Sequence, residues 1–124
     1  MPLSANLKLS TNRRIINHPH YEDTNLRMRI KKIYSFLYGL RPVSELHNIL
    51  KNEYKTKYLI IERHYCFGYP PGKPECAMLE ISHLDMARTA KDQACALIFN
   101  QESNAKNYFL KKFQSSYVAI FKVL

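Results

Sequence analysis

Apolar and polar residues alternate over residues 3–11, and this period of two is typical of a half-buried β-strand. The apolar positions of that segment are Leu3, Ala5, Leu7 and Leu9. Pro19 disfavours helical geometry at the residue before it, so residues 12–20 are predicted to form an extended turn. The first predicted elements are therefore a strand and a turn.

Helical spacing of apolar residues begins near Asp23. Residues 22–24 offer capping oxygens and negative charge to a helix start. Apolar side chains would then share one helix face, at Leu26, Ile30, Ile33, Tyr34 and Leu37. Gly39 offers a stop, and Pro42 suits the start of a second helix over roughly residues 42–53. The residues that this second helix would bury are Leu46, Ile49 and Leu50.

Four more elements are predicted in the second half of the sequence. Residues 57–62 form a short, β-rich, apolar run, which predicts a strand that is covered on both faces and central in its sheet. Residues 86–99 predict a helix. Residues 108–113 and 117–124 flank a polar Gln-Ser-Ser turn and predict two strands joined in a hairpin.

The order of these elements indicates an α/β or mixed α+β fold, with a small mixed sheet packed against three or more helices. A length of 124 residues fits one domain, which we expect to span residues 1–124. Hydrophobic residues make up 46% of the sequence and glycine is scarce, which favours a packed core over a disordered tail.

Positive charge is concentrated in the first half of the chain. The formal net charge is +9, and residues 1–58 carry eleven Lys and Arg against four Asp and Glu. Such an excess attracts anionic partners, whether nucleic acid, anionic lipid head groups or phosphorylated substrates, without distinguishing among them. A solvated basic face without a partner explains the charge equally well.

Apolar runs are too short to cross a membrane. The longest, Ala94–Phe99, is far below the ~20 residues that a membrane-spanning helix needs. The first residues also lack the apolar core of a signal peptide. Taken alone, these features predict a soluble chain that is not exported.

Three cysteines are present, and none forms the Cys-x-x-Cys pair of a zinc finger, so no metal site and no cofactor are expected in this chain. Cys66 and Cys76 flank a Pro/Gly-rich loop, whose ends could lie close enough for a disulfide in an oxidising compartment. Cys95 lies in an apolar run and is predicted to be a small buried side chain.

The densest group of polar side chains lies around residues 17–23, just after Arg13 and Arg14. The candidates for chemistry in this group are Asn17, His18, His20, Tyr21 and Glu22. Such residue types hold metals, act as general acid and base, or bind sugars and peptides. A purely structural role, with a capped helix and histidines bonded to nearby backbone, accounts for the same residues.

The sequence contains no phosphate-binding loop, dinucleotide fingerprint or nucleophile elbow, so composition favours a binding module over an independent enzyme. Basic and aromatic residues interleave between Lys31 and Tyr38, as in RNA-binding surfaces. Tyr34, however, already belongs to the predicted apolar face of the first helix. Nucleic acid is therefore not the expected partner.

Segments along nearly the whole chain match, in order, the C-terminal region of a known family. They are Met1-Pro2, residues 5–11, residues 16–23, Leu26-Arg27, residues 33–35, residues 58–60, Cys66, residues 74–76, Cys95, Phe113-Gln114 and residues 121–124. The Asn-His-Pro-His-Tyr-Glu-Asp string at residues 17–23 is the most specific of these. The chain thus resembles the dumpy-nineteen-like family of protein C-mannosyltransferases.

The chain departs from the family pattern in three places. Asn12-Arg13-Arg14 stands where members tend to have leucine, arginine and proline, and Ile81-Ser82 stands where many have a tryptophan. The loop over residues 67–73 also differs in character.

The resemblance implies a multi-spanning glycosyltransferase of the GT-C type, in which many membrane helices precede a C-terminal domain on the luminal side of the endoplasmic reticulum membrane. Members transfer mannose from dolichyl-phosphate mannose to C2 of a tryptophan indole in Trp-x-x-Trp motifs, notably in thrombospondin type 1 repeats. The family's catalytic carboxylate lies in an early luminal loop that has no counterpart here. This chain is therefore expected to lack a catalytic centre of its own.

The resemblance further implies that Met1 is an internal methionine of a longer protein, or that the chain is a truncated gene product. The partners would be the membrane-embedded remainder of the enzyme and its acceptor polypeptides. In the lumen a Cys66–Cys76 disulfide becomes plausible. Arg13, Arg14 and the cluster over residues 17–23 would lie close to the membrane, where we expect them to shape the acceptor side of the active site.

Two alternatives remain open from the residues. The first is a free-standing basic module that binds RNA or an anionic surface, and the second is an inert product of a truncated gene.

Overall fold

The computed structural model describes residues 10, 14–15, 23–39, 41–67 and 93–124. The chain divides into two compact units, one ending at Ile33 and the other running from Tyr34 to Leu124. The strand predicted over residues 3–11 and most of the turn predicted over residues 12–20 lie outside the described residues. A single domain spanning the whole chain stays a prediction.

The helix predicted to begin near Asp23 is present as α2, Thr24–Leu37. Oδ1 of Asp23 accepts hydrogen bonds from the backbone N–H groups of Asn25 and Leu26, at 2.9 and 3.2 Å. It thereby satisfies two donors that the first turn of a helix leaves without a backbone partner. The predicted apolar face is buried at Leu26, Ile30, Ile33 and Leu37, and Tyr34 is half-buried.

The end of α2 and the start of the next helix also follow the prediction. A Cβ atom at Gly39 would collide with the backbone carbonyl oxygen of Ser35, so the chain requires glycine at this turn. Pro42 is the N-cap of α3, Val43–Asn48, which continues into a π-helical segment, η1, Ile49–Glu53. The buried residues of this pair are Val43, Leu46 and Leu50, whereas Ile49 is half-buried.

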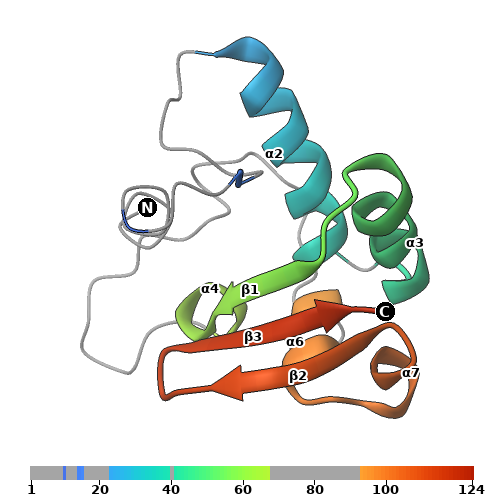
Figure 1. Ribbon diagram of the computed structural model, residues 1–124, viewed down its shortest axis with the longest axis vertical. Coiled ribbons are helices and arrows are strands. Elements are labelled where there is room, and N and C mark those ends of the chain that lie inside the picture. Colours follow the sequence, from blue (N-terminus) through green and yellow to red (C-terminus); the bar gives the residue numbers. More distant parts are fainter. Residues whose placement is uncertain (1–9, 11–13, 16–22, 40, 68–92) are drawn as a thin grey trace. The chain divides into compact units, whose positions relative to one another are not determined.

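Three strands form an antiparallel sheet: β1, Tyr58–Glu62; β2, Phe109–Gln114; and β3, Val118–Val123. Their order is β1-β3-β2 (Figure 1). The hairpin predicted from the end of the sequence is therefore confirmed as β2 and β3. Residues 57–62 are a strand as predicted, but among the described strands β3, not β1, is central, so that part of the prediction is wrong.

The burial of β1 gives the physical reason for this error. Leu59 and Ile61 are buried, whereas Ile60 and Glu62 on the alternate positions are half-buried. Only one face of the strand is thus fully covered. A strand covered on both faces has a continuous run of apolar side chains, but such a run also occurs in a strand that is covered on only one face.

A serine organises the hairpin turn, and a bulge lies in β2. The hydroxyl oxygen of Ser115 accepts hydrogen bonds from the backbone N–H groups of Tyr117 and Val118, at 3.2 and 3.1 Å. In the register of β2 against β3, the partners shift between Lys111 and Phe113, which leaves Lys112 as an extra residue. Phe113 consequently faces the same side of the sheet as Leu110, three residues before it.

The core lies on the side of the sheet that faces α6, Ala94–Phe99, which Figure 1 shows behind β2 and β3. The ring centroid of Phe99 lies 6.3 Å from that of Phe121, and the two rings meet at 61°. The helix predicted over residues 86–99 is confirmed in its described part, which is α6. Two short helices were not predicted: α4, Arg63–Phe67, and α7, Ser103–Lys106.

The side-chain amide of Gln101 closes the outer edge of β2. Its Nε2 donates to the backbone carbonyl of Phe109 at 3.0 Å, and its Oε1 accepts from the backbone N–H of Lys111 at 3.2 Å. Phe109 and Lys111 are two residues apart, so these groups point to the same side of the strand, away from β3. Nε2 also donates to the Ile98 carbonyl at 3.1 Å, which ties the end of α6 to the sheet.

The mixed α+β class is confirmed, with all strand pairs among the described residues antiparallel. Within the described ranges, no helix combines the length and apolar character needed to span a bilayer.

Candidate functional site beside β1

Most of the residues singled out from sequence lie outside the part of the chain that the structure describes. These are Arg13, Asn17, His18, His20, Tyr21, Glu22 and Cys76. Arg14 is described and is exposed to solvent. The acceptor-side role of this cluster stays a prediction.

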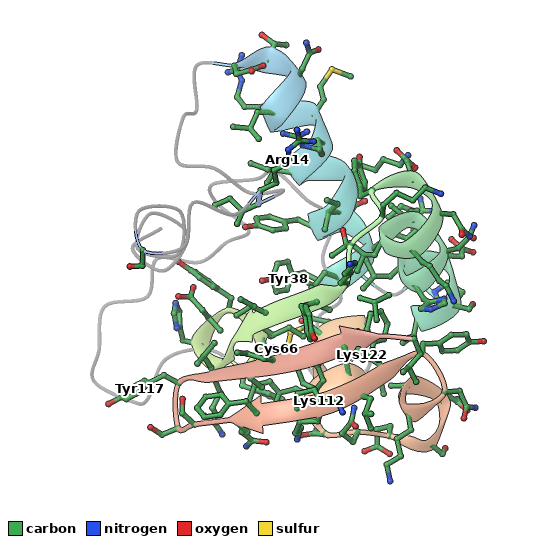
Figure 2. All side chains as sticks on the ribbon, in the orientation of Figure 1. Arg14, Tyr38, Cys66, Lys112, Tyr117 and Lys122 are labelled. Atoms are coloured by element: carbon green, nitrogen blue, oxygen red, sulfur yellow. A yellow bond between two sulfur atoms is a disulfide. The ribbon has the colours of Figure 1, made fainter. Side chains whose placement is uncertain are left out.

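Cys66 forms a disulfide with Cys95, not with Cys76 as predicted. The Cα atoms of Cys66 and Cys95 lie 5.8 Å apart, within the usual range for a disulfide. Both side chains are buried, and the bond joins α4 to α6 across 29 residues of sequence. Proximity along the chain suggested Cys76, but the packing of α4 against α6 brings Cys95 to the sulfur of Cys66, which is labelled in Figure 2.

A cluster of tyrosines and a Glu–His pair lies where α2 ends and where β1 passes into α4. Tyr34 and Tyr38 are one helical turn apart at the end of α2, and their ring centroids lie 5.2 Å apart at 76° in an edge-to-face pair. Edge-to-face pairs stabilise by about 1 kcal/mol beyond the area they bury. Tyr38 is only 3% exposed, so its hydroxyl lies in a region of low dielectric constant.

The strand end supplies the other members of this cluster. Nε2 of His64 lies 4.0 Å from Oε2 of Glu62, and both side chains are largely buried. The His64 ring packs on the ring of Tyr65, with centroids 3.9 Å apart. Glu62 ends β1 and residues 63–65 begin α4, so the strand-to-helix junction positions all three side chains.

The pKa of Tyr38 is raised well above 10.0, first because burial disfavours the phenolate and then because Tyr34, Glu62 and Tyr65 add negative potential. The phenol therefore stays protonated at any physiological pH and does not act as a base there. Within the described residues, no group of three or more His, Cys, Asp or Glu side chains has a geometry that could hold a metal ion.

This cluster was not predicted from the sequence. The spacing of Tyr34 and Tyr38 by four residues was available as a signal, because side chains at that spacing meet on a helix. Glu62 and His64 sit at the end of a predicted strand, and nothing in a single sequence places them beside Tyr38. His47 likewise showed no pattern in the sequence, yet its ring packs against Tyr108 with centroids 5.1 Å apart.

The fold and cluster describe a small α+β domain, and comparison with known proteins shows the family to which it belongs. Residues 1–123 match the family model described as Dpy19, Q-cell neuroblast polarisation. The chain therefore belongs to the Dpy19 family, as its resemblance to the C-mannosyltransferases predicted.

Similar proteins carry matching names. Human "Protein C-mannosyl-transferase DPY19L1" is 38% identical over 125 residues, covering 100% of this chain and 17% of that protein. Human "Probable C-mannosyltransferase DPY19L2" is 37% identical over 124 residues, covering 99% of this chain and 15% of that protein. "C-mannosyltransferase dpy-19" of Caenorhabditis elegans is 34% identical over 110 residues, covering 86% of this chain and 16% of that protein. The chain spans about a sixth of the length of these relatives.

Proposed function

We propose that this chain is the C-terminal, lumen-facing part of a protein C-mannosyltransferase. The observation that carries the proposal is the match over residues 1–123 to a family whose similar members are named C-mannosyltransferases. The intact enzyme would transfer mannose from dolichyl-phosphate mannose to tryptophan in Trp-x-x-Trp motifs, such as those of thrombospondin type 1 repeats.

In this proposal the catalytic centre lies in the remainder of the longer protein. The chain corresponds to only 15–17% of its relatives' length, so most of the enzyme lies outside it. This small share of the relatives' length supports a catalytic centre elsewhere in the longer protein, and the acceptor-side role proposed for residues 17–22 is tested below.

The Cys66–Cys95 disulfide supports a location in an oxidising compartment. Disulfides persist in the lumen of the endoplasmic reticulum and are rare in the cytosol, where thiols are kept reduced. The luminal side of the endoplasmic reticulum membrane is therefore the location that we propose.

The test uses the full-length protein in cells that lack other C-mannosyltransferases, with a secreted thrombospondin repeat as acceptor. Mass spectrometry of the repeat reports one added hexose on tryptophan. We expect transfer by the wild-type protein, and at least roughly a tenfold loss when His18, His20, Tyr21 and Glu22 are replaced by alanine, because each lost positioning contact costs about 1 kcal/mol or more.

A matched variant removes exposed side chains elsewhere, with Lys51 and Lys106 replaced by alanine, and should keep wild-type transfer. If the four-residue variant loses activity only in proportion to its loss of folded protein, the acceptor-side role is contradicted. If the wild-type protein transfers no mannose at all, the transferase proposal itself fails.

A further inference from the structure

The side of the sheet that faces away from α6 carries an unusual set of side chains, which we call the outward face. Two rows across the three strands define it. Tyr58, Lys122 and Leu110 are register partners in the first row, and Ile60, Ile120 and Phe113 are register partners in the second. Alternation along each strand puts these side chains opposite the buried Phe121 and Leu59.

Large apolar side chains on this face are open to solvent. Tyr58 is 56% exposed, Phe113 is 51% exposed and Leu110 is 41% exposed, and Tyr117 at the adjoining turn is 78% exposed. The bulge at Lys112 contributes to this, because it turns Phe113 outward beside Leu110. Contiguous exposed apolar surface of this kind marks a contact with another molecule or with a membrane.

Lysines are interspersed among these apolar groups. Lys122 lies between Tyr58 and Leu110 in the middle of the first row, and Lys112 occupies the bulge. Both lysines are exposed, and both are labelled in Figure 2. On the described part of this face the acidic side chain is Glu62, at the far end of β1, where it lies 4.0 Å from His64. The outward face is therefore both apolar and positively charged.

We propose that the outward face docks on the surface of an anionic phospholipid bilayer. Tyrosine rings suit the head-group region, and leucine and phenylalanine insert into the acyl boundary below it. Lysines bury their alkyl stems and reach the lipid phosphates with their ammonium groups. The inference does not depend on the transferase activity, because it rests only on residues of the sheet.

The arrangement suits a bilayer better than a protein or an RNA. A protein partner that covered the face would bury Lys122 in the middle of apolar surroundings, where an unpaired charge is costly. An RNA would need planar rings in the centre of the sheet for its bases to stack on. The central strand β3 instead presents Val118, Ile120 and Lys122, none of which has a planar ring.

The test is sedimentation of the 124-residue chain with vesicles of phosphatidylcholine, with and without phosphatidylserine. We expect binding that strengthens with phosphatidylserine. Replacing Lys112 and Lys122 by glutamine should weaken binding to the anionic vesicles roughly 25-fold, since each lysine near such a surface contributes about fivefold. Replacing Leu110 and Phe113 by serine should weaken binding more than roughly tenfold on both vesicle types.

A matched pair, Lys51→Gln with Lys106→Gln, removes the same charge from η1 and α7. It should weaken binding by less than about twofold, because these residues lie off the face and the field of a charge is screened within about 10 Å. Circular dichroism of each variant confirms that the fold is kept. Equal weakening by the two lysine pairs, absence of vesicle binding by the folded wild-type chain, or preferential binding to an oligouridylate would each overturn the proposal. Transferase assays of the full-length protein report separately on the proposed function.

Discussion

The two faces of the β1-β3-β2 sheet are built from the same three strands and differ completely in what surrounds them. On the inner face Phe109, Phe121 and Ala119 are fully buried, and Phe121 packs against Phe99 of α6. On the outward face Phe113 and Tyr58 leave half of their surface in water. The core buries the large apolar side chains of the inner face, whereas Tyr58, Leu110 and Phe113 on the outward face are exposed.

This difference teaches that apolar content alone does not locate a core. Residues on the inner face should contribute to the free energy of unfolding, and residues on the outward face should contribute to contacts with another surface. Paired substitutions of the same residue type, one on each side of the sheet, separate the two roles.

The largest contrast is expected between two phenylalanines. Phe121→Ala should lower the free energy of unfolding by about 4 kcal/mol, because it opens a cavity in the core. Phe113→Ala should lower it by less than about 1 kcal/mol, because the side chain is half-exposed. Urea unfolding followed by circular dichroism measures both. Equal losses would mean that the outward face is buried in the folded protein.

Removal of the Cys66–Cys95 disulfide should give the next largest loss in the free energy of unfolding. Replacing Cys66 and Cys95 together by serine should cost about 3 to 4 kcal/mol, the loop-closure value for a separation of 29 residues. Cys76→Ser is the matched control and should change the free energy of unfolding by less than about 0.5 kcal/mol. A large loss in the Cys76 variant would instead favour the Cys66–Cys76 bond that the sequence suggested.

The edge of β2 offers a comparison between two glutamines. Gln101→Ala should cost about 2 kcal/mol, because the backbone groups of Phe109 and Lys111 lose their partners in a partly buried site. Gln114→Ala removes one exposed contact, the acceptor for Nζ of Lys111 at 2.7 Å, and should cost only about 0.3 kcal/mol. Thermal unfolding of both variants would show whether the two costs differ in this order.

The smallest effect concerns pH and two tyrosines. The folded-state pKa of Tyr38 is raised, so its stabilising effect is complete below about pH 10 and is lost as pH rises above that value. The loss can reach about 1.4 kcal/mol per pH unit. Tyr38→Phe should flatten this part of the stability profile, whereas Tyr117→Phe at the exposed turn should leave it unchanged. Urea titrations between about pH 8 and pH 11 provide the measurement; identical profiles for the two variants would contradict the burial of Tyr38.

The elements that local chemistry determines could be predicted from the sequence. The carboxylate of Asp23 and the spacing of Leu26, Ile30 and Ile33 were enough to predict α2. The polar turn at Ser115, between two β-rich segments, was enough to predict the hairpin. In each case the signal and the structure that it predicts lie within a few residues of one another.

The features that depend on contacts between distant segments could not be predicted from the sequence. The apolar run at residues 57–62 fits an edge strand and a central strand equally. Only the position of β3 in the sheet shows that β1 is not the central strand among the described residues. Cys66 has a nearer cysteine along the chain, but helix packing brings Cys95 to it. Glu62 and His64 belong to a cluster only because the fold brings Tyr38, at the end of α2, to the end of β1.

The amide of Gln101 also limits where the sheet can be extended. Because this side chain occupies the backbone C=O of Phe109 and the backbone N–H of Lys111, another strand could pair with β2 at these positions only by displacing it. Unpaired backbone groups along a strand edge are a template for pairing with another chain, and covering them opposes aggregation. One glutamine thus protects this part of the β2 edge from pairing with a second molecule.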